Sequence, residues 1–130
     1  MIKINKRTNT NIEEINLSIP ALIAQWNVSE LDNRILFNQI VGLQIRKIRL
    51  MRKKTQTKLA KKISVTFQQI QKYEKGLNAC SYMNLKMIAE YLDVSIDYFT
   101  KPIDDLNLKL ITKRRDNGYY NNRAWTPDRV

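Results

Sequence analysis

Hydrophobic residues recur every three or four positions through the middle of the chain, the spacing that places them on one face of an α-helix. The first stripe begins near Asp32, a candidate N-cap, with a start near Phe37 as the equal alternative. It consists of Leu36, Ile40, Val41, Leu43, Ile45 and Ile48. Basic side chains between Arg46 and Lys54 take the other face of this stretch. The pattern predicts one long amphipathic helix.

Four shorter helical patterns follow, and a hydroxyl side chain able to cap a helix N-terminus opens each one. The caps are Thr55, Thr66, Ser81 and Ser95. The apolar stripes behind them are Leu59, Ala60 and Ile63, then Ile70 and Tyr73, then Leu85, Ile88, Ala89 and Leu92, and last Ile96 and Phe99. Gly76 suits the left-handed residue that closes a helix, and Pro102 ends the last pattern. Five helices within residues 38–102 predict an all-α fold, a compact bundle.

Two extensions flank this bundle, and their patterns are weaker. In residues 1–37 we expect one or two helical turns, because Pro20 should interrupt any helix that runs through residues 15–19. A short apolar turn within residues 19–26 is expected to pack on the bundle. Residues 103–130 interleave cations with Tyr119, Tyr120 and Trp125, which fits either a nucleic-acid contact or a disordered or partner-bound tail.

The composition of the 130 residues narrows the class of protein. Hydrophobic residues make up 43%, with 3 Gly and 3 Pro, which favours one globular, mainly helical domain. The lone Cys80 excludes an internal disulfide, and the absence of histidine removes the commonest general base and metal ligand. With no phosphate-binding glycine loop, zinc spacing or long apolar run, we expect a cytoplasmic protein that is not an enzyme and needs no metal or cofactor.

The net charge of +11 is concentrated in the predicted bundle. Residues 38–102 contain 13 cations and 4 acids, a difference of +9, and no acid occurs between Asp32 and Glu74. Such a stretch repels itself unless a polyanion relieves it. A solvated lysine-rich surface is one alternative, and a helix on a membrane surface is another, although these cations come from several short elements.

One register of residues runs from helix to helix through the bundle. It comprises Ile45-Arg46, Arg49, Thr55-Gln56, Leu59-Ala60, Val65, Ile70, Tyr73-Glu74, Gly76, Leu85, Ile88-Ala89, Leu92, Val94 and Phe99. In this register, and in the phrase VTFQQIQKYEKG, residues 42–99 resemble the lambda-repressor/Cro-like (XRE-type) helix-turn-helix domain. The resemblance implies a five-helix lambda-repressor-like fold. Ser64 and the Lys53-Lys54 pair stand where the family has glycine, so we expect strain at both turns.

The resemblance also implies a DNA-binding site on the helix that follows Thr66, which would enter the major groove. It places Phe67, Gln68 and Lys72 toward the bases. A ring can pack on thymine methyl groups, an amide can pair with adenine, and an ammonium can reach guanine acceptors. For Phe67 the alternative is that the ring closes the edge of the core.

Further residues are expected to hold the DNA backbone, which fixes the register without reading sequence. They are Arg46, Gln56, Gln69, Lys75 and Asn78. For each cation among them, a solvated surface is the alternative. Arg49 and Glu74 resemble a pair of family residues that ties the first helix to the end of the third, so we expect a structural ion pair.

These features together predict a sequence-specific regulator of transcription, a repressor that binds double-stranded DNA as a homodimer on a two-fold operator. An antitoxin with the same domain, whose extensions wrap a toxin partner, is one alternative. A protein-interaction module whose basic face meets an acidic protein is another. No membrane partner is expected.

Overall fold

The computed structural model describes residues 11–26 and 30–106, and the regular elements within these ranges are all helical. They are α1 (Ile12–Ala24), α2 (Glu30–Met51), α3 (Gln56–Lys62), α4 (Phe67–Glu74), α5 (Tyr82–Leu92) and the 3₁₀ helix η1 (Ile96–Phe99). A further helical turn covers residues 101–106. The expected all-α fold is confirmed, and the five expected helices correspond to α2, α3, α4, α5 and η1, of which α2 begins earlier, at Glu30.

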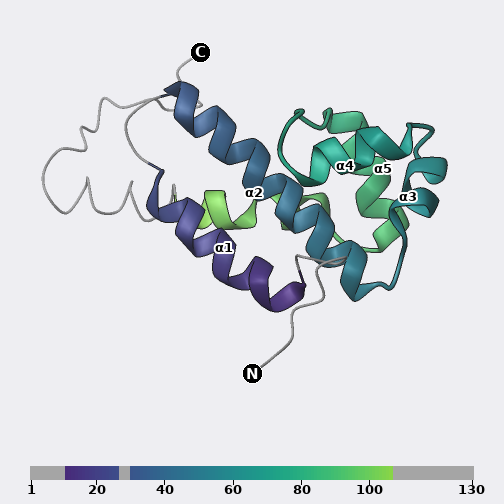
Figure 1. The fold of residues 1–130 in the computed structure, drawn as a ribbon, viewed down its shortest axis with the longest axis horizontal. Helices are drawn as coiled ribbons and strands as arrows, with labels where there is room; N and C mark the ends of the chain where they lie inside the picture. The colour runs from purple at the N-terminus through teal and green to yellow at the C-terminus, as the bar shows by residue number, and fades with distance from the viewer. Residues whose placement is uncertain (1–10, 27–29, 107–130) are drawn as a thin grey trace, which may run out of the picture.

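The long helix α2 is the element on which the others pack. Its 22 residues span about 33 Å, and Figure 1 shows α1 along one side of it and α3, α4 and α5 on the other. Val41, Ile45 and Ile48 are buried in the core shared with α3, α4 and α5, whereas Ile40 is buried against α1. Two faces of one helix therefore join the N-terminal part to the bundle.

The main core is built from the stripes that the sequence pattern predicts. Its largest fully buried side chains on the three helices after α2 and on η1 are Leu59, Ile70, Ile88, Leu92 and Phe99. Burying each such side chain contributes roughly 1.5–3 kcal/mol. This core fixes α3 and α4 against α2 and so positions the surface described below.

The four predicted N-caps are confirmed, because each hydroxyl accepts a hydrogen bond from a backbone N–H in the first turn of its helix. The pairs are Thr55 with Lys58 at 3.1 Å, Thr66 with Gln69 at 3.0 Å, Ser81 with Asn84 at 3.1 Å, and Ser95 with Asp97 at 3.4 Å. Gly76 follows α4 with a φ of 72°, the left-handed conformation expected at the end of that helix.

The expectation that Pro20 interrupts a helix is wrong, because α1 runs through it as 13 continuous residues. Pro20 lies on the exposed side of α1, and the residue whose carbonyl loses its partner, Asn16, is exposed too, so water can replace the missing bond. On the other side Ile15 and Ile19 are buried in a cluster with Ile40 and Ile103. Burial of these two side chains offsets the roughly 3 kcal/mol that an internal proline costs.

Asp32 is not an N-cap, because α2 begins at Glu30 and includes it. The partition into 1–37, 38–102 and 103–130 stays a prediction, but both of its boundaries fall within helical stretches. Trp26, Leu22 and Ile23 pack against the cluster between α1 and α2, as expected of that apolar turn. The tail residues Tyr119, Tyr120 and Trp125 lie outside the described residues.

Candidate nucleic-acid interface

A tight turn joins α3 to α4 and fixes the angle between them. Ile63 caps the C-terminus of α3, and Ser64 adopts a φ of 58°. The Val65 N–H then donates to the Ala60 carbonyl at 3.0 Å, and Val65 packs on the core. Lys53, in the turn before α3, has a φ of 57°. Both turns where strain was expected, because they lack glycine, therefore hold a non-glycine residue at a positive φ.

Helix α4 divides into a buried face and an exposed face. Ile70, Tyr73 and Glu74 are buried, and the Tyr73 hydroxyl accepts a 3.0 Å hydrogen bond from the Asn84 side chain on α5. The three residues predicted to meet bases lie on the other side: Gln68 and Lys72 are exposed, and 39% of Phe67 is exposed. The structure thus places Phe67, Gln68 and Lys72 together on the solvent side of one rigid helix.

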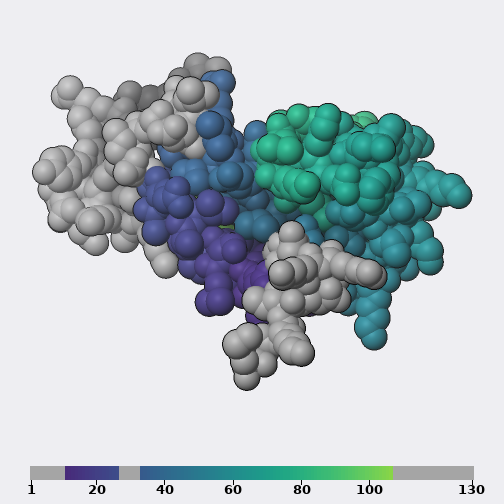
Figure 2. All heavy atoms as spheres, viewed as in Figure 1, coloured from purple at the N-terminus to yellow at the C-terminus, as the bar shows by residue number. Residues whose placement is uncertain are grey.

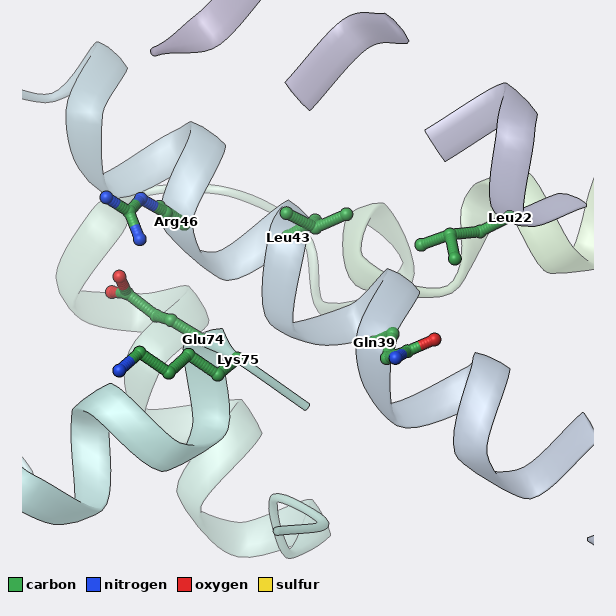
Figure 3. Close-up of a pocket in the computed structure, with 6 residues that line it drawn as sticks. All are labelled: Leu22, Gln39, Leu43, Arg46, Glu74 and Lys75. Carbon is green, nitrogen blue, oxygen red and sulfur yellow. The ribbon is translucent and has the colours of Figure 1, made fainter. Parts of the chain in front are cut away.

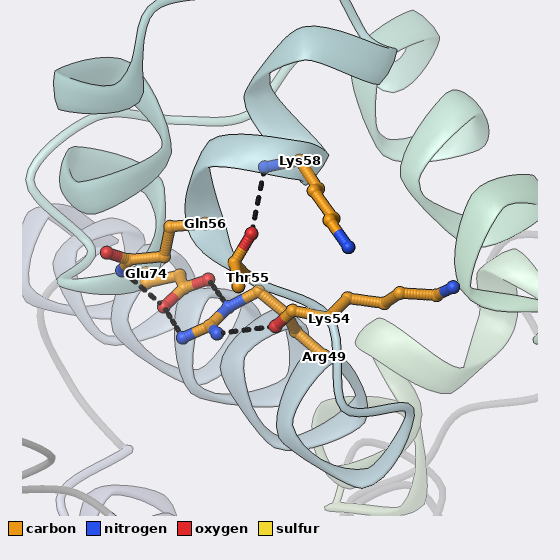
Figure 4. Close-up of polar contacts among 6 residues, drawn as sticks. All are labelled: Arg49, Lys54, Thr55, Gln56, Lys58 and Glu74. Carbon is orange, nitrogen blue, oxygen red and sulfur yellow. Dashed lines mark hydrogen bonds and ion pairs between the residues drawn. The ribbon is translucent and has the colours of Figure 1, made fainter.

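A buried polar network anchors α4 to α2 at the base of this surface (Figure 4). Arg49 Nε donates to Glu74 Oε2 at 2.6 Å and a second guanidinium nitrogen donates to Glu74 Oε1 at 3.0 Å, a bidentate pair. The third nitrogen donates to the Lys54 carbonyl at 2.9 Å. Since both side chains are at least 92% buried, loss of either charge would leave the other uncompensated. The expected ion pair is present.

The same network holds Gln56, the residue expected to grip the DNA backbone. Its Nε2 donates to Glu74 Oε1 at 2.9 Å, a contact that the sequence pattern does not reveal. An amide nitrogen carries two N–H groups, so this bond uses one of them and fixes the side chain at the start of α3. Gln56 is therefore presented in one orientation, which suits a residue that positions a ligand.

Two more residues from the predicted backbone set, one in α4 and one in the loop after it, are hydrogen-bonded to each other. The Asn78 side-chain amide donates to Gln69 Oε1 at 3.4 Å, which links the loop after α4 to the first turn of that helix. Gln69 is half-buried and Asn78 is exposed. These two amides lie beside each other, at the edge of the exposed face of α4.

Arg46 and Lys75, the two cations of that set, also lie close together. Both line a cavity of about 240 Å³ between α1, α2 and α4, with Leu22, Gln39, Leu43 and Glu74 as the other lining residues. Figure 3 shows the charged ends of Arg46 and Lys75 extending to the same side, with the Glu74 carboxylate between them. The pair places positive charge beside α4.

A groove of about 340 Å³ runs where α2, α3 and α4 meet. Its lining consists of Arg46, Arg49, Leu50, Lys54, Thr55, Gln56, Thr57 and Phe67. Lys54 and Thr57 were not among the site residues expected from the sequence, although they flank Thr55 and Gln56 directly. The groove joins the exposed edge of Phe67 to cationic and hydroxyl side chains, the mixture that contacts phosphate and sugar in protein–DNA complexes.

Three further features of the described part of the chain concern metal ligands, membrane helices and its cysteine. No group of three or more His, Cys, Asp or Glu side chains gathers there, and no helix within it is long and apolar enough to cross a membrane. Burial raises the pKa of the Cys80 thiol to about 12, so the thiol is protonated at neutral pH and Cys80 packs against the core. Cys80 is therefore not placed to act as a nucleophile.

Comparisons with known proteins agree with this geometry. Residues 45–99 match the family model described as helix-turn-helix. An uncharacterised HTH-type transcriptional regulator of Rickettsia conorii is 41% identical over 70 residues, which are 54% of this chain and 56% of that protein. One from Sinorhizobium medicae is 44% identical over 59 residues, 45% of this chain and 42% of the relative.

A third relative, an uncharacterised transcriptional regulator in the ATPase CF(0) region of Rhodospirillum rubrum, is 45% identical over 64 residues, 49% of this chain and 59% of that protein. The chain thus spans about half the length of the curated relatives that it matches. The part that matches the family model, residues 45–99, contains α3 and α4, and the expected lambda-repressor-like fold is confirmed.

Proposed function

We propose that this chain is a repressor of the lambda-repressor/Cro-like (XRE-type) helix-turn-helix family and that it reads double-stranded DNA with α4. The match of residues 45–99 to the helix-turn-helix family model and the similarity to HTH-type transcriptional regulators support this proposal. The observation that carries the proposal is the exposed row of Phe67, Gln68 and Lys72 on a helix whose other face is locked into the core. A recognition helix must present base-reading side chains rigidly.

The roles within the row follow from the chemistry of each side chain. Gln68 offers a donor and an acceptor to the edge of adenine, and Lys72 offers donors to guanine N7 and O6. Phe67 is partly exposed and partly packed in the groove, so its ring can meet a thymine methyl group while its inner edge stays on the protein. Base reading is thus assigned to three residues on two successive turns of α4.

Backbone contacts are proposed for the residues that surround this row. Gln56 is oriented by Glu74, and Arg46 extends beside Lys75. Gln69 and Asn78 complete the ring as a bonded pair. Phosphate contacts from this ring would fix α4 in register with the groove, while the bases are read in its centre.

The charge distribution supports a polyanionic partner over an acidic protein. The chain carries no acid between Asp32 and Glu74, and Glu74 is buried and paired. The exposed row nevertheless contains an amide and a ring, which suit base edges better than a run of carboxylates. We therefore propose that this protein acts in the cytoplasm on chromosomal DNA, as a homodimer on paired half-sites.

Selection from random double-stranded DNA with the full chain, at a stated salt concentration, tests this function. We expect one motif to be enriched, with two related halves. Recovery of no motif, together with affinity that depends on salt alone, would contradict sequence-specific regulation and favour a non-specific basic surface.

Two variants then test the assignment of roles. Gln68→Ala should relax the preference at one base position by roughly 1–3 kcal/mol, and Lys72→Ala should do so at a different position. Lys86→Ala removes the same charge from an exposed site on α5 and serves as the matched control, with the base preferences unchanged. Identical motifs for all three variants would show that α4 does not read the bases.

A further inference from the structure

Two uncharged stretches of the chain lie side by side next to α4. No charged residue occurs in residues 35–45 of α2, and none occurs in residues 76–85, which form the loop after α4 and the start of α5. The stretches touch, because a Cβ atom built on Gly76 would lie 2.6 Å from Gln39 Cα. In a chain with a net charge of +11, this is a distinct surface.

Large apolar side chains are exposed on this surface. The exposed fractions are 71% for Tyr82, 69% for Leu77, 64% for Met83 and 38% for Phe37. Beside them a cavity of about 440 Å³ is lined by Trp26, Asn33, Arg34, Phe37, Asn38 and Ala79. We call the surface formed by Phe37, Leu77, Ala79, Tyr82 and Met83 the uncharged face. Phe37 and Ala79 line this cavity together, and Leu77, Tyr82 and Met83 lie within four positions of Ala79 in the chain. Contiguous exposed apolar groups mark an interaction site, whereas scattered ones need no explanation.

We propose that the uncharged face binds a second copy of this chain, an inference that rests on the proposed function and names the surface of its homodimer. Two copies with a net charge of +11 each repel one another. The repulsion is smallest where the facing surfaces carry no charge, and apolar contact then supplies the attraction. An acidic protein would not be attracted to this face, because the positive charges that complement an acidic protein lie on the basic surface.

The place of the uncharged face in the fold fits a role on DNA. Its loop begins directly after the C-cap of α4, and the green part of the chain around α4 and α5 stands at the surface of the face drawn in Figure 2. An isologous contact there relates the two copies of α4 by a two-fold axis. Paired recognition helices of this kind read two related half-sites.

The small size of the face predicts a weak dimer. A buried tyrosine contributes about 150–250 Å², so four partly exposed side chains fall below the roughly 800 Å² per partner of a standard interface. We therefore expect mostly monomer in dilute solution. Two adjacent half-sites raise the effective concentration of one copy beside the other, and the dimer then forms on the DNA.

The experiment compares binding of the full chain to a single half-site and to two half-sites at the selected spacing, with sedimentation of the free protein over a range of concentrations. The wild-type chain is expected to bind the paired site with a cooperativity factor on the order of 5–150. Tyr82→Asn combined with Met83→Gln removes apolar surface without changing the charge. We expect this variant to lose the cooperativity, to sediment as a monomer at every concentration, and to keep its half-site affinity.

Leu17→Asn is the matched control, because Leu17 is 76% exposed on α1 and lies outside the uncharged face. Unchanged cooperativity in the Tyr82 and Met83 variant, or its loss in Leu17→Asn, would overturn the assignment of the face. Unchanged half-site affinity shows that the variant is folded. Failure of the wild-type chain to bind any half-site would instead overturn the proposed function. Sedimentation of the wild-type chain and of the two variants would still show whether the uncharged face binds a second copy.

Discussion

Gly42 lies so close to α4 that a Cβ atom on it would sit 2.2 Å from the Tyr73 carbonyl oxygen. The same atom would lie 2.8 Å from the Glu74 carbonyl oxygen, so both obstacles are backbone atoms that cannot rotate away. The glycine thus allows α2 to pass directly against the end of the helix that carries the proposed reading residues.

We therefore predict that Gly42→Ala destabilises the protein, although alanine favours a helix over glycine by about 1 kcal/mol. The overpacking should outweigh that gain and give a net loss on the order of 1–3 kcal/mol. Urea unfolding followed by circular dichroism measures it. Asn16→Ala, at an exposed position of α1, is the control and should be neutral or slightly stabilising. Greater stability for Gly42→Ala would show that α2 and α4 are not packed this closely.

The bidentate pair of Arg49 and Glu74 gives a second prediction. Glu74→Gln keeps the shape of the side chain and leaves the Arg49 guanidinium buried without a counter-charge, which should cost about 3–5 kcal/mol. Arg49→Met combined with Glu74→Leu removes both charges. This double variant should lose less stability than the sum of the losses in the single variants Arg49→Met and Glu74→Leu. Additive losses in this double-mutant cycle would mean that the two residues do not interact.

The turn between α3 and α4 gives a third prediction, because Ser64 has a φ of 58°. A residue other than glycine in the left-handed conformation costs roughly 1–2 kcal/mol. Glycine removes this cost, but it also raises the conformational entropy of the unfolded chain, which offsets part of the stabilisation. Ser64→Gly should therefore stabilise the protein by a few tenths to about 1 kcal/mol. Lys61→Gly, in the preceding helix, should destabilise it by about 0.5–1 kcal/mol. Destabilisation by both changes would exclude strain at Ser64.

The structural features that could be predicted from the sequence are those that depend on residues close together in the chain. Thr55, Thr66 and Gly76 act within one turn of their own position, so their types reveal the helix ends. The prediction that Pro20 interrupts a helix was wrong because the burial that keeps α1 intact comes from contacts with α2 and Ile103, which are distant in the chain. Local propensity cannot register such a contribution.

The candidate site likewise combines features that a local pattern predicts with contacts between residues that are distant in the chain. The exposed row on α4 follows from helical periodicity, since Ile70 and Tyr73 define the inner face. The bond from Gln56 to Glu74 spans 18 positions, and the contact of Gly76 with Gln39 spans 37 positions. Neither contact leaves a pattern in the sequence, so only the structure shows that Glu74 holds the Gln56 side chain in place.

A fourth prediction concerns Lys75, whose side chain extends beside Arg46. If Lys75 contacts a phosphate, binding of DNA releases the counterion held there, and the affinity falls with salt accordingly. Lys75→Ala should weaken binding about equally for all DNA sequences and reduce the slope of log K against log salt by about 1. Titrations at several salt concentrations measure this slope. Lys101→Ala removes the same charge from a residue that pairs with Asp105 at 3.6 Å, beyond η1, and should leave the slope unchanged. An equal change of slope in both variants would mean that net charge alone drives binding, whereas a change only in Lys75→Ala identifies a phosphate contact beside α4.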